Sequence, residues 1–218
     1  MKVAEHPFYF VAASYVTSVS DIKVTTLQGL GEGLKTCSDD SIFYHTFQSL
    51  GRHHFLTEGF SNDFAQWALA ACNQPELAEE LAALDIREYL QLADLRGDLS
   101  RLVAQFCTSH PGQASKDAFE PFYFCESMEV TVPLGVEART LEEFRRGLEH
   151  LSRSSFHYHF LSSRLRLQLR INDFSFWFHT GLDLPDLAQQ VNRIDIYTNT
   201  LESAKERLLT LVDRALKS

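Results

Sequence analysis

Aromatic and β-branched residues are concentrated in two segments of the chain, and apolar residues at helical spacing follow each segment. Residues 8–19 read FYFVAASYVTSV and residues 122–132 read FYFCESMEVTV. Such residues favour strands. Leu27, Leu30 and Leu34 then recur every three or four positions, which places them on one face of a helix. The pattern predicts a mainly α protein with short β-strands, an α+β fold.

Residues typical of helix starts divide the rest of the chain into further helices. Thr140 and Glu143 make a capping box, in which two side chains satisfy backbone N–H groups of the first turn. Other residues that suit an N-cap or a first turn are Thr26, Ser38, Asn62, Pro75, Ser152, Asn172 and Pro185. Amphipathic patterns over 99–106 and 200–216 predict closing helices. We expect one strand or hairpin and four or five helices in each half.

The two halves of the sequence match each other along most of their length. PFYF at residue 7 and PFYF at residue 121 open a match at an offset of 114 residues. After four extra residues within 51–60, an offset of 110 residues aligns SNDFAQW with INDFSFW. We interpret the chain as two homologous tandem repeats, 1–107 and 121–218, joined by a turn-rich linker over 108–120. Related repeats often pack with pseudo-twofold symmetry, and we expect that here.

Composition and charge narrow the classes of protein. Hydrophobic residues make up 44% of the 218 residues, which is enough for a folded core. The net charge of −9 argues against binding to nucleic acids or anionic membranes, because both attract an excess of Lys and Arg. No apolar run approaches the ~20 residues of a membrane span, and the N-terminus lacks a signal-peptide core, so we expect a cytoplasmic protein. The four cysteines are far apart, which is typical of reduced thiols that act as small hydrophobes.

Polar and aromatic residues at corresponding positions of the two halves form the candidate binding site. They are Tyr44, His45, Asn62, Asp63 and Trp67 in the first half, and Tyr158, His159, Asn172, Asp173 and Trp177 in the second. If Asn62 caps a helix, Asp63 lies in its first turn and shares a face with Trp67. Two interpretations stay open. Either each histidine hydrogen-bonds a helix start within the core, or these groups line a pocket that orients a ligand.

Catalytic alternatives rest on the same histidines. Ser41 and His45 are four residues apart, as are Ser155 and His159, and an aspartate could complete a Ser-His-Asp triad. The chain lacks a G-x-S-x-G elbow, so we do not assign catalytic residues. Metal ligands are the other alternative, but the histidines show no H-E-x-x-H spacing, so we expect no metal and no cofactor. The histidines concerned are His45, His53, His54, His157, His159 and His179.

A basic segment of the second half offers a candidate anion patch. In SSRLRLQLRIN, Arg164, Arg166 and Arg170 alternate with leucines, as on a strand with one basic face. The alternative is that the helix carrying His159 continues through this segment. The three arginines then either form surface ion pairs or bind an anion.

The segments SIFYHTFQSLGRHHFLTEGFSNDFAQW and ELAEELAALDIREY of the first half resemble a prokaryotic family, Domain of Unknown Function 5752. The resemblance implies an opening Phe-x-Phe-Cys segment, a Tyr-His helix and an Asn-Asp-Phe-x-x-Trp helix. It also implies that the histidine helix continues through the arginine segment. The second half keeps FYFCESMEV and FHYHF, whereas the first half has Val11 where the family often has Cys. The resemblance covers nearly the whole chain twice and implies no activity.

These observations favour binding over catalysis. We expect a non-catalytic protein whose ligand is a protein partner or a small polar molecule, with a homodimer as one possible state. The rival hypothesis is a hydrolase or metal-dependent enzyme that uses the pairs His45/Asp63 and His159/Asp173.

Overall fold

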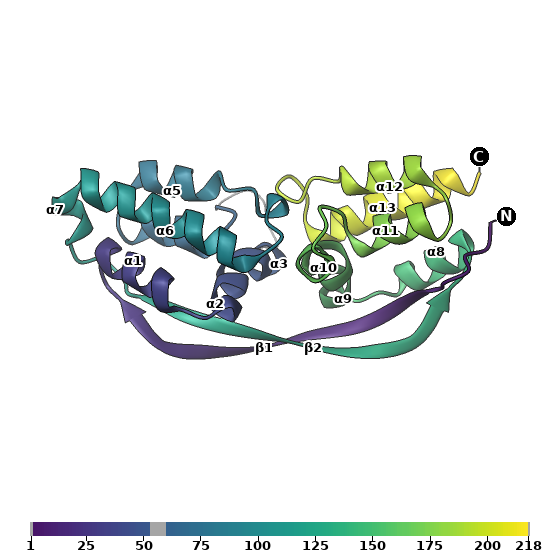
Figure 1. Cartoon of the computed structure of the whole chain (residues 1–218), viewed down its shortest axis with the longest axis horizontal. Helices are drawn as coiled ribbons and strands as arrows, with labels where there is room; N and C mark the ends of the chain where they lie inside the picture. Colours follow the sequence, from purple (N-terminus) through teal and green to yellow (C-terminus); the bar gives the residue numbers. More distant parts are fainter. Residues whose placement is uncertain (1, 53–59, 218) are drawn as a thin grey trace. The chain divides into compact units, whose positions relative to one another are not determined.

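The computed structural model describes residues 2–52 and 60–217, which form a mixed α+β, mainly helical fold (Figure 1). Its two strands, β1 (Phe8–Val24) and β2 (Phe122–Ala138), form one two-stranded sheet. Helices after β1 are α1 (Leu27–Thr36), α2 (Asp39–Phe43), η1 (Tyr44–Gln48), α3 (Ser49–Arg52), α4 (Asp63–Ala70), α5 (Pro75–Ala82), η2 (Ile86–Glu88), α6 (Leu92–Ser109) and α7 (Pro111–Ala114). Helices after β2 are α8 (Leu141–Glu149), α9 (Arg153–His157), η3 (Tyr158–Ser162), α10 (Ser163–Leu167), α11 (Asp173–Thr180), α12 (Pro185–Asn192) and α13 (Leu201–Ala215).

The chain forms two compact units whose boundaries lie within the strands. Unit 1 consists of Met1–Tyr15 and Glu129–Ser218, and unit 2 consists of Val16–Met128. Each unit therefore contains the helices of one half of the sequence and the opening strand segment of the other half. A main-chain bond from Ala4 N to Arg139 O closes one end of the strand pair, and one from Ala118 N to Thr25 O closes the other. These two bonds show that β1 and β2 run antiparallel.

The exchanged strand segments pack directly on the helices of their units. In unit 1, Phe8 and Phe10 lie against Phe144 of α8. A Cβ atom on Gly147 of α8 would lie 2.3 Å from the Phe10 ring, so only glycine allows this approach. The same relationship holds in unit 2, where a Cβ atom on Gly33 of α1 would lie 2.5 Å from the Phe124 ring. The opening aromatic residues of each strand are thus core residues of the unit that receives them.

The predicted helix starts are confirmed. Thr140 and Glu143 form the expected capping box at α8. The other side-chain caps predicted from sequence are Thr26, Ser38, Asn62, Ser152 and Asn172, each of which accepts a bond from a backbone N–H of its helix. Pro75 and Pro185 occupy the first turns of α5 and α12. These starts depend on local chemistry, which explains why the sequence is sufficient to place them.

Three expectations need correction or extension. The strands are long, with 17 residues each, because they pair with each other instead of forming short elements within each half. The arginine segment is not a strand: α10 covers Ser163–Leu167 and ends at Gln168, which has a left-handed backbone with φ of 51°. Residues 108–120, interpreted as a linker, contain the end of α6 and the short helix α7.

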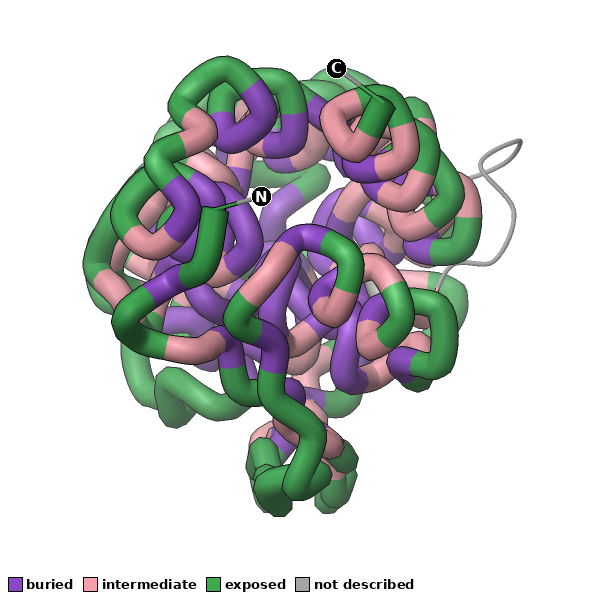
Figure 2. The backbone as a smooth tube through the Cα atoms, turned by 90° about the vertical axis from the view of Figure 1, so that its right-hand side faces the viewer, coloured by how far each residue is buried: buried purple, intermediate pink, exposed green. Residues whose placement is uncertain are grey.

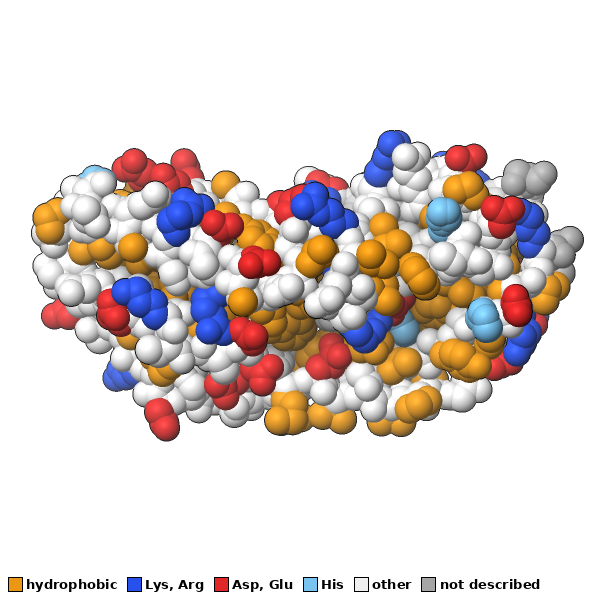
Figure 3. Space-filling view, in the orientation of Figure 1, with side chains coloured by type: hydrophobic (Ala, Val, Ile, Leu, Met, Phe, Trp, Pro, Cys, Tyr) orange, Lys and Arg blue, Asp and Glu red, His pale blue; other side chains and the backbone are white. Residues whose placement is uncertain are grey.

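Buried residues lie on the inner faces of the helices, whereas much of the strand pair is exposed (Figure 2). Residues 128–137 of β2 are exposed along their whole length. Hydrophobic side chains gather at the lower edge of the space-filling view, where Figure 1 draws the strands (Figure 3). Among the described residues, no helix has both the length and the apolar composition to cross a membrane.

Candidate functional site

The two histidines of the candidate site lie in π-helical turns that interrupt α-helices. His45 lies in η1 between α2 and α3, and His159 lies in η3 between α9 and α10. Such turns are rare, and they occur frequently at functional sites. Both side chains are buried: His45 is 4% exposed and His159 is 2% exposed.

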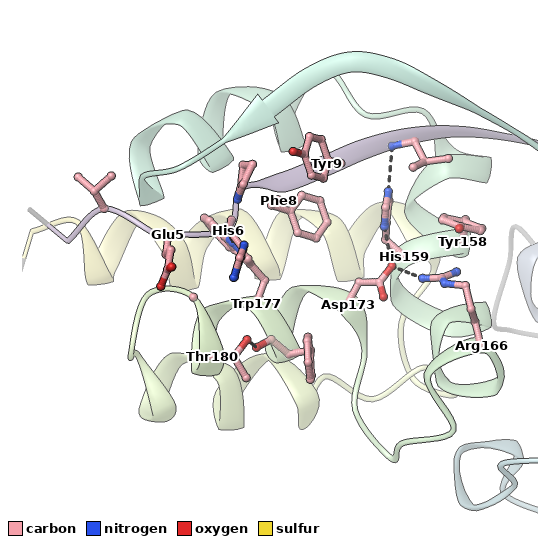
Figure 4. A pocket seen from close by; sticks show the side chains of 15 residues that line it. Glu5, His6, Phe8, Tyr9, Tyr158, His159, Arg166, Asp173, Trp177 and Thr180 are labelled. Atoms are coloured by element: carbon pink, nitrogen blue, oxygen red, sulfur yellow. Dashed lines mark hydrogen bonds and ion pairs between the residues drawn. The ribbon is translucent and has the colours of Figure 1, made fainter.

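Each histidine holds the strand segment that its unit receives from the other half. Nε2 of His45 accepts a hydrogen bond from the backbone N–H of Cys125 at 2.9 Å. Nε2 of His159 accepts one from the backbone N–H of Val11 at 3.1 Å (Figure 4). The imidazoles therefore fix strand segments that are distant in sequence.

On its other side, each histidine is paired with the aspartate predicted from the repeated motif. Nδ1 lies 2.8 Å from Asp63 Oδ2 in unit 2 and 2.8 Å from Asp173 Oδ2 in unit 1. Asn62 and Asn172 cap α4 and α11, so both aspartates occupy a first helical turn, where the helix dipole favours negative charge. The Asn-Asp motif thus places a carboxylate opposite the imidazole.

An arginine completes each cluster. Arg52 Nη2 lies 2.5 Å from Asp63 Oδ2, and the Arg52 guanidinium lies 3.9 Å from the centre of the Tyr44 ring. Arg166 pairs with Asp173 in the same way and lies 4.2 Å from the centre of the Tyr158 ring. We call each set of His, Asp, Arg and Tyr a His-Asp-Arg-Tyr cluster.

The hydrogen bonds define the protonation state of the imidazoles. A ring nitrogen that accepts a hydrogen bond from a backbone N–H carries no proton. The proton of the neutral imidazole is therefore on Nδ1, which donates a hydrogen bond to the aspartate. In unit 2, burial lowers the pKa of His45 and outweighs the opposing effect of Asp63. Burial alone would raise the pKa of Asp63, but its bonds and charge interactions with His45, Arg52 and Ser49 lower it overall. A neutral imidazole beside an ionised carboxylate is the state that satisfies all these groups.

The tryptophans of the motif anchor the chain just before each exchanged strand. Trp67 Nε1 donates to Glu120 O at 2.8 Å, and Trp177 Nε1 donates to His6 O at 2.9 Å. Trp177 also stacks on Phe144, with ring centres 5.5 Å apart. Both indole N–H groups are therefore occupied.

An open groove adjoins each cluster. In unit 1 it has a volume of about 750 Å³ and is walled by Phe8, Tyr9, Phe176 and Trp177, with Asp173 and Arg166 at one end (Figure 4). In unit 2 a groove of about 490 Å³ is lined by Asp63, Gln66, Trp67, Phe119 and Glu120, among others. Small-molecule sites commonly have 300–1,000 Å³ and combine aromatic walls with a few polar groups.

A family model described as "Family of unknown function (DUF5752)" matches residues 5–213. The chain belongs to this family. A solved structure titled "The structure of OrfY from Thermoproteus tenax" is similar to it, with 27% sequence identity and a TM-score of 0.84, and the match covers 100% of this chain and 99% of that one. No curated protein matches the chain.

The DUF5752 chain does not assemble the Ser-His-Asp triads considered from its sequence. Ser155 Oγ accepts a bond from Ala13 N at 3.1 Å, and Nε2 of His159 faces Val11 N instead of a serine. In unit 2, Nε2 of His45 likewise faces Cys125 N. A serine nucleophile would need that nitrogen as its base, so these contacts do not support the triad interpretation.

The metal hypothesis finds no cluster in the parts of the DUF5752 chain that the structure describes. Within 2–52 and 60–217, no three His, Cys, Asp or Glu side chains converge on one point that could hold a metal ion. His157 Nδ1 lies 2.8 Å from the Tyr15 hydroxyl, and His179 is exposed. His53 and His54 lie outside the described residues.

The three arginines of the proposed anion patch have different surroundings. Arg164 is buried and donates to Phe160 O at 2.8 Å and to Asn192 Oδ1 at 3.2 Å. Arg166 is exposed and belongs to the cluster of Asp173. Arg170 is exposed beyond the end of α10. The helix therefore separates side chains that an alternating strand would have placed on one face.

Sequence reasoning missed two members of the site. Arg52 was not singled out, although it lies 114 residues before Arg166 and therefore at the corresponding position. The bonds from Val11 and Cys125 to the histidines involve backbone atoms, which leave no residue-type signal. Arg52 could have been identified only from the repeat offset. No feature of the sequence could have identified the backbone contacts.

Proposed function

We propose that this DUF5752 protein is a non-catalytic binding protein and that the groove of unit 1 is its ligand site. The observation that carries the proposal is the combination of a cavity of about 750 Å³, aromatic walls and one ion pair at its end. Two aromatic residues that line this groove are exposed, Tyr9 at 61% and Phe176 at 38%. The ligand is a small polar molecule with an apolar part.

The hydrogen bonding of the histidines supports binding over catalysis. A general base needs a free lone pair near the substrate, and both imidazoles use theirs on a backbone N–H. The rival hypothesis of a hydrolase that uses His45/Asp63 or His159/Asp173 would require the exchanged strand to leave. The clusters are better explained as fixed walls of the grooves.

We also infer that the chain arose by tandem duplication, as its sequence repeat suggests. In support, the helices after β1 and β2 follow the same order, and both halves build the same cluster and a groove at corresponding residues. The unequal grooves suggest that unit 1 kept the ligand site. Four free cysteines are consistent with a cytoplasmic setting.

A thermal-shift screen of polar metabolites, followed by mapping of hits on backbone NMR spectra, tests the proposal. We expect a hit to perturb the amides of Tyr9, Phe176 and Thr180, which line the groove. The matched variant Phe176→Gln copies Gln66 of unit 2 and should weaken the hit without lowering the melting temperature of the free protein. Hits that map only outside this groove would refute the assignment.

A protein partner is the second candidate, and a row of exposed apolar residues on β2 favours it. The row consists of Met128, Val130, Val132, Leu134 and Val136. Val132→Thr combined with Val130→Thr should reduce capture of such a partner while leaving the groove unchanged. If capture is unaffected, the row is not the contact surface.

A further inference from the structure

We propose that the groove of unit 1 takes a cationic group, an alkylammonium or guanidinium, held between the exposed aromatic rings and the carboxylates of its wall. This inference rests on the groove being the ligand site and adds the charge of the ligand. Three features of the groove carry it.

The first feature is a carboxylate oxygen with unused bonding capacity. Asp173 Oδ2 receives the bonds from His159 and Arg166, and Figure 4 shows the second oxygen turned away from them. In unit 2 the corresponding oxygen of Asp63 accepts a bond from Ser49 Oγ at 2.7 Å. The corresponding serine of unit 1, Ser163, instead donates to His159 O at 2.7 Å. Among the described residues, none donates to Asp173 Oδ1, although the Asp173 side chain is only 13% exposed. This oxygen has acceptor capacity to spare, and an ammonium or guanidinium can donate to it.

The second feature is the charge of the lining. Glu5 and Asp173 both line the groove, and its one Lys or Arg among the described lining residues is Arg166. The Arg166 charge is already engaged, because its guanidinium bonds to Asp173 and lies over the Tyr158 ring. With Arg166 paired to Asp173, Glu5 is the remaining Asp, Glu, Lys or Arg among the described lining residues, and it leaves the lining negative. A negative lining repels anions and favours cations.

The third feature is a tyrosine ring of unit 1 that has no cation over it, although the corresponding ring of unit 2 has a lysine. Tyr123 has the Nζ atom of Lys23 5.2 Å from its ring centre. The corresponding tyrosine of unit 1 is Tyr9, and the residue 114 positions after Lys23 is Glu137. No cation of the described residues lies over Tyr9, which is 61% exposed at the groove. In unit 2 the tyrosine at this strand position therefore contacts a cation. In unit 1, where the larger groove lies, the face of the Tyr9 ring remains available to a cation from a ligand.

The test uses probes that share a short alkyl chain and differ in charge, on the full chain. n-Butylammonium and n-butylguanidinium carry the cation, whereas n-butanol and butyrate are neutral and anionic. NMR titration at low salt should show saturable shifts of the amides of Tyr9, Phe176 and Thr180 with the two cations. The affinity for the neutral and anionic probes should be at least about tenfold lower, and binding of the cations should weaken as salt is added.

Two variants and one control separate the contributions. Tyr9→Leu and Glu5→Gln should each weaken n-butylammonium binding by about twofold to fivefold, because each removes one exposed electrostatic contact. The control Tyr123→Leu changes the corresponding ring of unit 2 and should leave the titration unchanged. A lysine-containing tripeptide with blocked ends, compared with free agmatine, shows whether the cation belongs to a peptide or to a small amine.

The outcomes distinguish this inference from the proposed function. Butanol or butyrate binding in the groove as tightly as the cations would overturn the inference and leave the groove as a ligand site. Cation shifts that map elsewhere, or that survive both variants, would also overturn it. If neither the probes nor any metabolite perturbs the groove, the proposed function itself fails.

Discussion

Nε2 of His159 accepts a hydrogen bond at 3.1 Å from the backbone N–H of Val11, a residue that lies 148 positions earlier in the chain. The same imidazole contacts Asp173 through Nδ1 at 2.8 Å. One side chain thus links the exchanged strand segment of unit 1 to the first turn of α11. His45 makes the corresponding link between Cys125 and Asp63 in unit 2.

Replacing His159 by Phe should therefore destabilise unit 1 even though the aromatic volume is kept. The change leaves the Val11 N–H without its acceptor and removes one of the two partners of Asp173, which keeps Arg166. An unpaired buried group costs about 1–3 kcal/mol, so we expect a loss of about 1–3 kcal/mol in urea unfolding. The exposed residue His179 of α11 provides the control, since His179→Phe should change stability by less than about 0.5 kcal/mol. Equal effects of the two variants would show that His159 does not hold the strand.

His45 should make the stability of unit 2 depend on pH. In the unfolded chain its imidazole has the ordinary pKa of about 6.5, and burial lowers the pKa in the folded chain. The unfolded state therefore binds more protons below pH 6.5, so the contribution of His45 is complete above that pH and is lost as the pH falls toward the folded pKa. Asp63, whose pKa is also lowered, stays ionised over this range.

Urea unfolding at pH 7.5 and pH 5.5 measures this effect. The wild type should lose stability at the lower pH, and His45→Gln should lose less, because an amide keeps an acceptor and a donor but does not titrate. The protection of the Cys125 amide from hydrogen exchange, relative to its intrinsic rate at each pH, should be lower at pH 5.5 than at pH 7.5 in the wild type. A pH dependence that is the same in both proteins would remove His45 as its source.

Local features of the fold could be predicted from the sequence, because they depend on neighbouring residues. The caps Thr26, Ser38 and Asn62 and the proline starts are correct for this reason. The pairing of His45 with Asp63 was one of two interpretations, because spacing along the chain does not say which faces of two helices meet.

The exchange of strands could not be predicted. From the sequence, Phe8 and Phe122 are equally suited to pack on the helices that follow them. That they pack on the helices of the other half depends on the path of the whole chain, which local sequence does not reveal. The π-helical turns at His45 and His159 are also invisible, since they result from tertiary contacts and not from residue propensity. The arginine segment was ambiguous because alternation over a few residues fits a strand and, with a buried Arg164, also a helix.

Two glycines should be essential to the seating of the exchanged strands. A Cβ atom at Gly147 or Gly33 would lie 2.3 or 2.5 Å from the ring of Phe10 or Phe124, so the ring must move. We expect Gly147→Ala and Gly33→Ala each to lower the free energy of unfolding by about 1–3 kcal/mol, the usual cost of overpacking.

The helix α6 supplies the matched control for these glycines. A Cβ atom at Gly97 meets nothing within 4 Å among the described residues. Gly97→Ala should therefore raise stability by about 0.5–1 kcal/mol through helix propensity alone. Thermal and urea unfolding of the three variants gives the comparison. Stabilisation by Gly147→Ala would show that Phe10 is not seated against α8.

Arg164 and Arg166 should differ in their effects on stability, although they are two residues apart. Arg164 is buried, and its guanidinium satisfies Phe160 O and Asn192 Oδ1. Arg164→Met leaves these acceptors without a donor and should cost about 2–3 kcal/mol. Arg166→Met removes an exposed partner of Asp173, which keeps His159, and should cost less than about 1 kcal/mol.

The same two variants test the anion patch. An anion site needs cations that face solvent together, but the guanidinium of Arg164 is buried within unit 1 and bonds to protein acceptors. Phosphate at constant ionic strength should therefore raise the melting temperature of the wild type and of Arg166→Met by the same small amount. A phosphate-dependent rise that disappears in Arg166→Met would support the anion site. It would also contradict the cationic ligand inferred for the adjoining groove, because the groove would then prefer a negative ligand.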